Sequence, residues 1–110
     1  MDISYLGKNQ RIFDISRKFT NAGIRTANYS IPLVNQDQQT VIDKRYRKTW
    51  VMIRGVDRPG EDVTVTIRGD SIKNMEYLCG LISDHFPELE PIPSQDSPSK
   101  IPFYKRYFKG

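Results

Sequence analysis

Two segments, 49–54 and 63–68, constrain the fold of this chain more than any other part of it. They read TWVMIR and VTVTIR, and the second alternates apolar and polar residues strictly, which is typical of a strand with one buried face. The residues between them, GVDRPGED, are rich in turn-forming glycine, proline and aspartate. The sequence therefore predicts a β-hairpin. Its core-facing residues would be Val51, Ile53, Val63, Val65 and Ile67.

The other face of this hairpin gathers basic, aromatic and hydroxyl side chains. Its members would be Trp50, Met52, Arg54, Thr64, Thr66 and Arg68. Basic residues beside a tryptophan favour binding of single-stranded nucleic acid, because unpaired bases stack on aromatic rings. The alternative is that Trp50 and Met52 form a second small core under the N-terminal helix or the tail, since large aromatic residues are mostly buried.

The register of the hairpin affects this comparison. If Ile53 pairs with Val63, then Lys48 lies directly opposite Arg68. Like charges that face each other across two strands destabilise a sheet. A phosphate lying between them would make the same pair favourable, so this register would support binding of a nucleic acid.

A helix is predicted directly after the hairpin. Asp70 or Ser71 can accept hydrogen bonds from the unpaired backbone N–H groups at its start, and Pro87 blocks its continuation. Apolar residues recur at spacings of three and four and predict one buried stripe. The stripe comprises Ile72, Met75, Leu78, Cys79, Ile82 and Phe86. Gly80, in mid-helix, costs about 1 kcal/mol relative to alanine, and close packing on the sheet would explain it.

A second amphipathic helix is predicted nearer the N-terminus. Its stripe is Ile12, Ile15, Phe19 and Ala22, and Gly23 would adopt the left-handed conformation that ends a helix. Strands are predicted at 3–6 and 24–34, with a polar loop at 35–40. Residues 41–46 either extend into the first strand of the hairpin or form a separate short strand. Together these elements predict an α+β domain over residues 1–87. Its small antiparallel sheet, including the hairpin 49–54/63–68, would carry two helices on one face.

The remainder of the chain differs in composition. Residues 88–99 contain several prolines and serines, as linkers do, and residues 100–110 read KIPFYKRYFKG. The aromatic positions 103, 104, 107 and 108 match one face of a short helix, which needs a surface on which to form. The aromatic residues of this basic-aromatic tail could stack on nucleic acid, fold back onto this domain, or dock on a partner protein or a second copy. We favour protein docking, within or between molecules. The docking residues would be Phe103, Tyr104, Lys105, Arg106, Tyr107 and Phe108.

Charge is distributed unevenly along the chain. The formal net charge of +4 divides into +6 over 1–60, −6 over 61–99 and +4 over 100–110. A basic run at 43–48 leads into the hairpin and either neutralises phosphates or forms an ordinary solvated strand or loop. The candidate nucleic-acid-binding residues are Lys44, Arg45, Arg47, Lys48, Trp50, Arg54 and Arg68. The charge layout would also permit the basic half to pair with the acidic segment, or copies to associate head to tail.

Several classes of protein are disfavoured. No apolar run approaches the roughly 18 residues of a membrane span, and the N-terminus lacks the pattern of a secretory signal. A single cysteine, Cys79, excludes an internal disulfide framework, so we expect a cytoplasmic protein. Cys79 and the single histidine, His85, would lie on different helix faces, and no phosphate-binding or dinucleotide-binding glycine motif is present. We therefore expect neither catalysis nor a cofactor.

Two hypotheses about function remain. The first is a small non-catalytic accessory domain that binds nucleic acid, single strands favoured, through a basic and aromatic sheet face. The second is a protein interaction module, such as an assembly factor, a small subunit or an inhibitor of a larger complex, that docks through its aromatic tail. Binding to nucleic acid should weaken steeply with salt, whereas aromatic docking should not.

Overall fold

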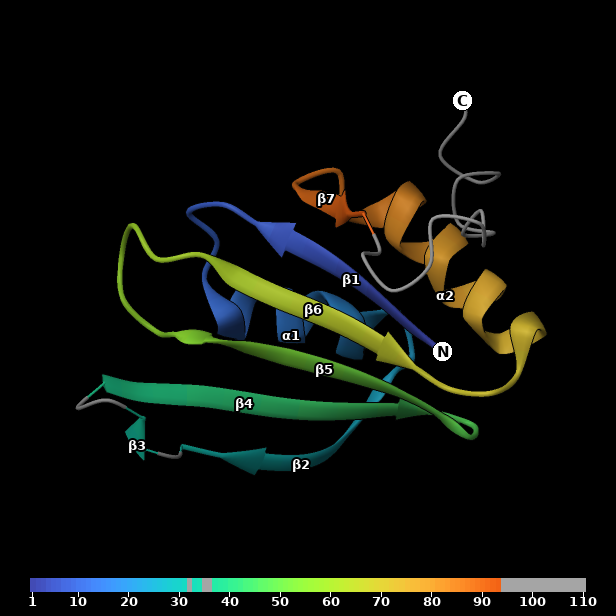
Figure 1. Cartoon of the computed structure of the whole chain (residues 1–110), viewed down its shortest axis with the longest axis horizontal. Coiled ribbons are helices and arrows are strands. Elements are labelled where there is room, and N and C mark those ends of the chain that lie inside the picture. The colour runs from blue at the N-terminus through green and yellow to red at the C-terminus, as the bar shows by residue number, and fades with distance from the viewer. Residues whose placement is uncertain (32, 35–36, 94–110) are drawn as a thin grey trace.

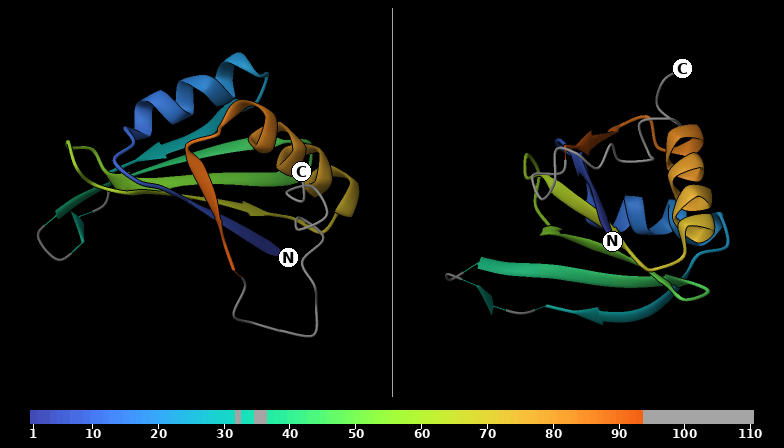
Figure 2. Two further views of the ribbon diagram at one scale, coloured as in Figure 1. Left: turned by 90° about the horizontal axis from the view of Figure 1, so that it is seen from above. Right: turned by 45° about the vertical axis from the view of Figure 1, so that its right-hand side comes forward.

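The computed structural model describes residues 1–31, 33–34 and 37–93, which form the strands and helices labelled in Figure 1. These elements are β1 (Asp2–Gly7), α1 (Ile12–Asn21), β2 (Arg25–Ser30), β3 (Leu33–Val34), β4 (Asp37–Tyr46), β5 (Thr49–Val56), β6 (Val63–Arg68), α2 (Ile72–His85) and β7 (Leu89–Ile92). The sheet is antiparallel in the order β2-β4-β5-β6-β1-β7, and β3 pairs with β4. Both helices cover the same face (Figure 2), which confirms the α+β prediction.

The hairpin of β5 and β6 has the predicted faces but a different register. Trp50 pairs with Arg68 and Gly55 pairs with Val63, so the two strands are shifted by two residues relative to the expected pairing. Because side chains alternate with a period of two, this shift leaves every residue on its predicted face. The cause is Gly55, which continues the strand: a Cβ there would lie 3.1 Å from the backbone oxygen of Asp62.

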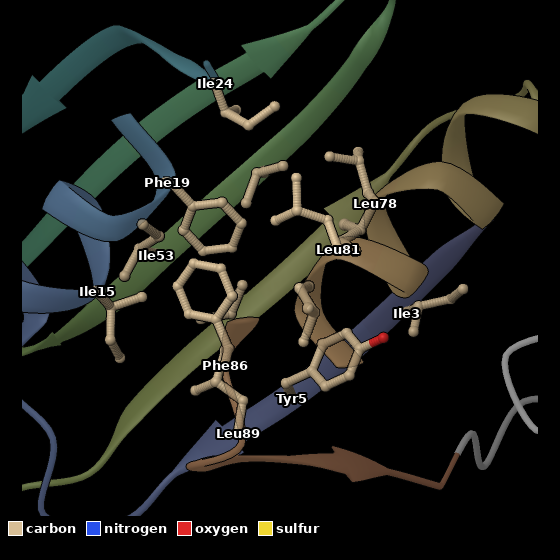
Figure 3. Packing of buried hydrophobic residues seen from close by; sticks show 14 of the residues in the cluster. Ile3, Tyr5, Ile15, Phe19, Ile24, Ile53, Leu78, Leu81, Phe86 and Leu89 are labelled. Atoms are coloured by element: carbon tan, nitrogen blue, oxygen red, sulfur yellow. The ribbon is translucent and has the colours of Figure 1, made fainter. Parts of the chain in front are cut away.

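The core lies between the sheet and the two helices. The predicted stripe of α1 is buried at Ile12, Ile15 and Phe19. Gly23, which follows the end of α1, has a φ of 91°, the left-handed conformation predicted for it. The ring of Phe19 stacks on that of Phe86, just after α2, with 4.3 Å between centroids (Figure 3). This contact joins the two helices above the sheet.

Helix α2 departs from its predicted stripe at one end. Ser71 caps it as predicted, because its hydroxyl accepts a hydrogen bond from the Asn74 backbone N–H at 3.2 Å. Ile72 was predicted to be buried, but it is 54% exposed. It is the first residue of α2, where the helix lies beyond the ends of the strands in Figure 1. Leu81, outside the predicted stripe, is buried instead.

Three further boundaries differ from the sequence prediction. The expected strand 24–34 is divided into β2 and β3, and the expected loop 35–40 is wrong from Asp37 onward, where β4 begins. The linker expected from residue 88 is wrong for Leu89–Ile92, which pair with β1 as β7. Pro91 is tolerated there because β7 is an edge strand, and the buried Leu89 anchors it. The tail at 100–110 lies outside the described residues.

Close packing on the sheet does not account for the presence of a glycine at position 80, contrary to the sequence prediction. Among the described residues, a Cβ built on Gly80 would meet no side chain beyond its chain neighbours, and no backbone outside its own part of α2, within 4 Å. Replacing Gly80 by alanine should therefore raise the free energy of unfolding by about 1 kcal/mol, because alanine loses less backbone entropy in a helix. Urea denaturation followed by circular dichroism measures this change. The matched control is Gly69→Ala, where the new Cβ would lie 2.9 Å from Thr49 Oγ1 and should destabilise the fold. Equal effects at the two glycines would contradict the packing described.

Candidate functional site

One row of side chains crosses five strands on the face of the sheet opposite the helices, which we call the outer face. The paired residues are Arg25 with Arg45, Arg45 with Trp50, Trp50 with Arg68, and Arg68 with Asp2. Residues directly opposite in antiparallel strands share a face, with their Cβ atoms about 4.5–5.5 Å apart. We call these five residues the basic row. It brings together three arginines that are far apart in the sequence, around one tryptophan.

Trp50 is accessible at the centre of this row. Its side chain is 38% exposed, and the Arg45 guanidinium lies 5.2 Å from the centre of its ring, within the range of a cation–π interaction. Arg45 Nε also donates a hydrogen bond to the Arg47 carbonyl at 2.7 Å, which holds the guanidinium over the indole ring. Because α1 covers the opposite face, Trp50 does not form a second core under the N-terminal helix.

Arg68 occupies the other side of Trp50. Its Nε and Nη2 donate to the two carboxylate oxygens of Asp2 at 2.9 and 2.8 Å, and this interaction lowers the pKa of Asp2. Exposed ion pairs of this kind contribute little net free energy, since water and salt screen them. An arriving phosphate can therefore compete with Asp2 for the Arg68 guanidinium.

Three other predicted residues lie near this row. Arg47 and Lys48 form the two-residue connection between β4 and β5, next to Trp50, and both are exposed. Arg47 has a φ of 56°, a conformation that non-glycine residues adopt at a cost. Arg54 also lies on the outer face, opposite Thr64, but it is four residues further along β5 than Trp50. These side chains extend the positive surface from the end of the hairpin along β5.

Lys44 does not belong to this surface, contrary to the sequence prediction. It is fully buried on the helix side of β4. Its Nζ donates to Thr20 Oγ1 at 2.7 Å, to Thr26 Oγ1 at 2.9 Å and to the Ile24 carbonyl at 3.4 Å. Burial lowers its pKa. The reason is the alternation of β4, which turns Lys44 inward and Arg45 outward.

Arg25 is the one arginine of the row that the sequence did not predict. It begins β2, and only the pairing of β2 with β4 places it opposite Arg45. No local pattern predicts which of several strands will be neighbours, so the sequence offered no direct signal for it. The predicted docking residues at 103–108 lie outside the described residues.

Cys79 and the acidic residues of the β5–β6 connection are engaged in contacts within the fold. Cys79 is buried, and burial raises the pKa of its thiol to about 11, so the thiolate is scarce near neutral pH. Acidic residues of the β5–β6 connection have protein partners: Asp57 pairs with Arg11 at 3.1 Å, Glu61 pairs with Arg58 at 3.0 Å, and Asp62 accepts from the Asn9 N–H at 3.3 Å. Within the described ranges, no three acidic, histidine or cysteine side chains gather as metal ligands would.

Comparison with known proteins adds no relative. No protein-family model, no curated protein and no solved structure matches this chain. Neither helix in the described part of the chain has the length and apolar character needed to cross a membrane. The outer face, with cationic groups on both sides of an exposed indole, is suited to a ligand that combines negative charge with a flat aromatic ring.

Proposed function

We propose that this chain is a small non-catalytic accessory domain that binds single-stranded nucleic acid on its outer face. The observation that carries the proposal is Trp50, exposed between Arg45 and Arg68 on the two neighbouring strands. An indole stacks with an unpaired base, and guanidinium groups bind phosphates in bidentate geometry. Single strands are favoured over duplexes because the bases of a duplex are already stacked on one another.

The spacing of the basic row suits a single-stranded nucleic acid that runs across the sheet, perpendicular to the β-strands. Neighbouring strands lie about 4.8 Å apart, so Arg45 and Arg68 are separated by about 10 Å with Trp50 midway. A base on Trp50 would have an arginine available for a phosphate on each side. Arg25 continues the row beyond Arg45, toward the edge of the sheet. We propose a cytoplasmic setting, where a buried free thiol such as Cys79 stays reduced.

A fluorescence titration tests the proposal directly, because Trp50 is the single tryptophan of the chain. A single-stranded oligonucleotide should quench its emission and bind more tightly than the matching duplex. If three arginines neutralise three phosphates, the slope of log affinity against log salt should be about −2. Absence of any response at low salt would reject the outer face as the binding site and would leave the protein-docking hypothesis for the tail.

Replacing Trp50 by alanine should weaken binding of a labelled single strand about 5- to 150-fold, the equivalent of losing about 1–3 kcal/mol of stacking. Fluorescence anisotropy of the labelled strand measures this without the tryptophan. The control is Tyr77→Ala, since Tyr77 is a comparably exposed aromatic residue on α2, away from the outer face. Arg68→Ala should in addition make the salt slope shallower by about 0.7. Folded Trp50 and Arg68 variants that bind as tightly as the parent would refute the proposal.

A further inference from the structure

The two edges of the sheet differ in how well they are protected. At one edge, β7 is short and contains Pro91, which has no N–H to offer to another strand. At the other edge lies β2, in which all six residues are exposed and none is proline. Among the described strands, β2 pairs only with β4 (Figure 1), so one side of its backbone faces outward. An edge strand that presents unpaired backbone N–H and C=O groups in this way is a template for a further strand.

An apolar patch lies beside this edge on the helix side. Phe13 of α1 and Tyr29 of β2 are exposed neighbours, with 6.0 Å between ring centroids, and the exposed Ile31 follows β2 directly. They lie at one side of an open hollow of about 410 Å³, whose other lining residues are Gln38, Thr40, Val56, Asp57 and Arg58. Large apolar side chains gathered at one exposed place mark an interaction surface.

A bulge in β2 makes this strand complementary to itself. The register shifts between Thr26 and Asn28, so Arg25, Asn28 and Ser30 lie opposite outer-face residues of β4, whereas Thr26 and Tyr29 lie opposite the inward-facing Lys44 and Ile42. In an antiparallel pair of two β2 strands, Arg25 can therefore face Ser30 of the second copy while Thr26 faces Tyr29. Both pairs keep their side chains on a common face, and no two like charges meet.

We propose that β2 pairs with β2 of a second copy around a two-fold axis, which joins the two sheets into one. The interface is isologous, as in most homodimers, because each copy presents the same strand. Tyr29 of each copy packs beside Thr26 of the other and withdraws part of the apolar patch from water. The outer faces become continuous, with Arg25 at the seam. The pairing does not require nucleic acid, so it stands or falls separately from the proposed function.

Sedimentation equilibrium of the full chain without nucleic acid tests the pairing. The mass should rise with concentration from 12.8 kDa toward twice that value. In the double variant Ala27→Lys, Asn28→Lys, basic residues would face each other across the axis, whereas within each chain position 28 lies opposite Asp43, so the fold itself is not opposed. Association should weaken at least about tenfold. Asp84→Lys, which makes the same change in net charge on the exposed surface of α2, should associate like the parent. A chain that stays monomeric at about 1 mM would overturn the proposal.

Amide hydrogen exchange locates the interface independently of any variant. Outward-facing N–H groups of β2 should exchange more slowly at high than at low chain concentration, because a second strand covers them. Amides of β7, at the opposite edge, serve as the internal control and should not change. A dimer that leaves β2 exchange unchanged, or that the double variant does not weaken, would place the seam elsewhere and overturn the pairing.

Discussion

Replacing Phe19 by alanine should lower the free energy of unfolding by about 3–5 kcal/mol, the range for deleting a buried phenylalanine ring. Phe19 is fully buried on α1, and its ring stacks on Phe86 at 4.3 Å with 25° between the planes. The substitution removes apolar burial, leaves a cavity between the two helices and breaks an aromatic pair. Urea denaturation at equilibrium measures the loss.

Phe13→Ala is the matched control for this prediction. It makes the same chemical change on the same helix, at a side chain that is 39% exposed, so it should cost much less. Denaturation at low chain concentration keeps self-association out of the comparison. A double-mutant cycle of Phe19 and Phe86 should return a coupling of about 0.5–1.5 kcal/mol for the ring pair. Equal losses for Phe19→Ala and Phe13→Ala would contradict the core described in Figure 3.

The parts of the fold that the sequence predicted are those fixed by local patterns. The alternation around Val65 identified the buried face of β6, and the stripe through Ile15 and Phe19 identified α1. Ser71 was recognisable as a cap because capping is satisfied within one turn. The hairpin register was not predictable in this way, because Gly55 is a turn residue in most contexts and acts here as a strand residue in close contact with Asp62.

The candidate site was predicted only in part, because it depends on which strands are neighbours. Trp50 and Arg68 were grouped from one hairpin and Arg45 from the basic run that leads into it, whereas Arg25 reaches them through the non-local pairing of β2 with β4. Lys44 illustrates a conflict between two rules. Alternation turns it inward, but lysines are rarely buried, so the whole basic run was assigned to the surface. Its three hydrogen bonds compensate its burial, and no sequence pattern announces them.

Replacing Lys44 by alanine should lower the free energy of unfolding by about 2–4 kcal/mol, because a cavity forms and hydrogen bonds from a buried cation are lost. Those bonds hold Thr20 at the end of α1, Ile24 in the connection and Thr26 in β2 to one point on β4. Lys44→Met keeps most of the volume and needs no desolvation of a charge, so it should cost less than alanine. Denaturation of both variants beside the parent measures the difference, and equal losses for the two would refute the cavity contribution.

The pH dependence separates the charge of Lys44 from its packing. Burial lowers the pKa of Lys44 below its ordinary value of 10.5, so between the lowered pKa and 10.5 the unfolded chain binds more protons than the folded chain. The free energy of unfolding contributed by this group therefore rises with pH through that window. The parent should gain stability relative to Lys44→Met as the pH approaches 10.5. Cys79 has the opposite effect: because its pKa is raised, its contribution to the free energy of unfolding falls as the pH rises through its titration. Cys79 is present in both proteins, so this contribution cancels in their difference. A difference that stays constant with pH would mean that the three hydrogen bonds fully offset the cost of burying the Lys44 charge, and the lowered pKa of Lys44 would then be wrong.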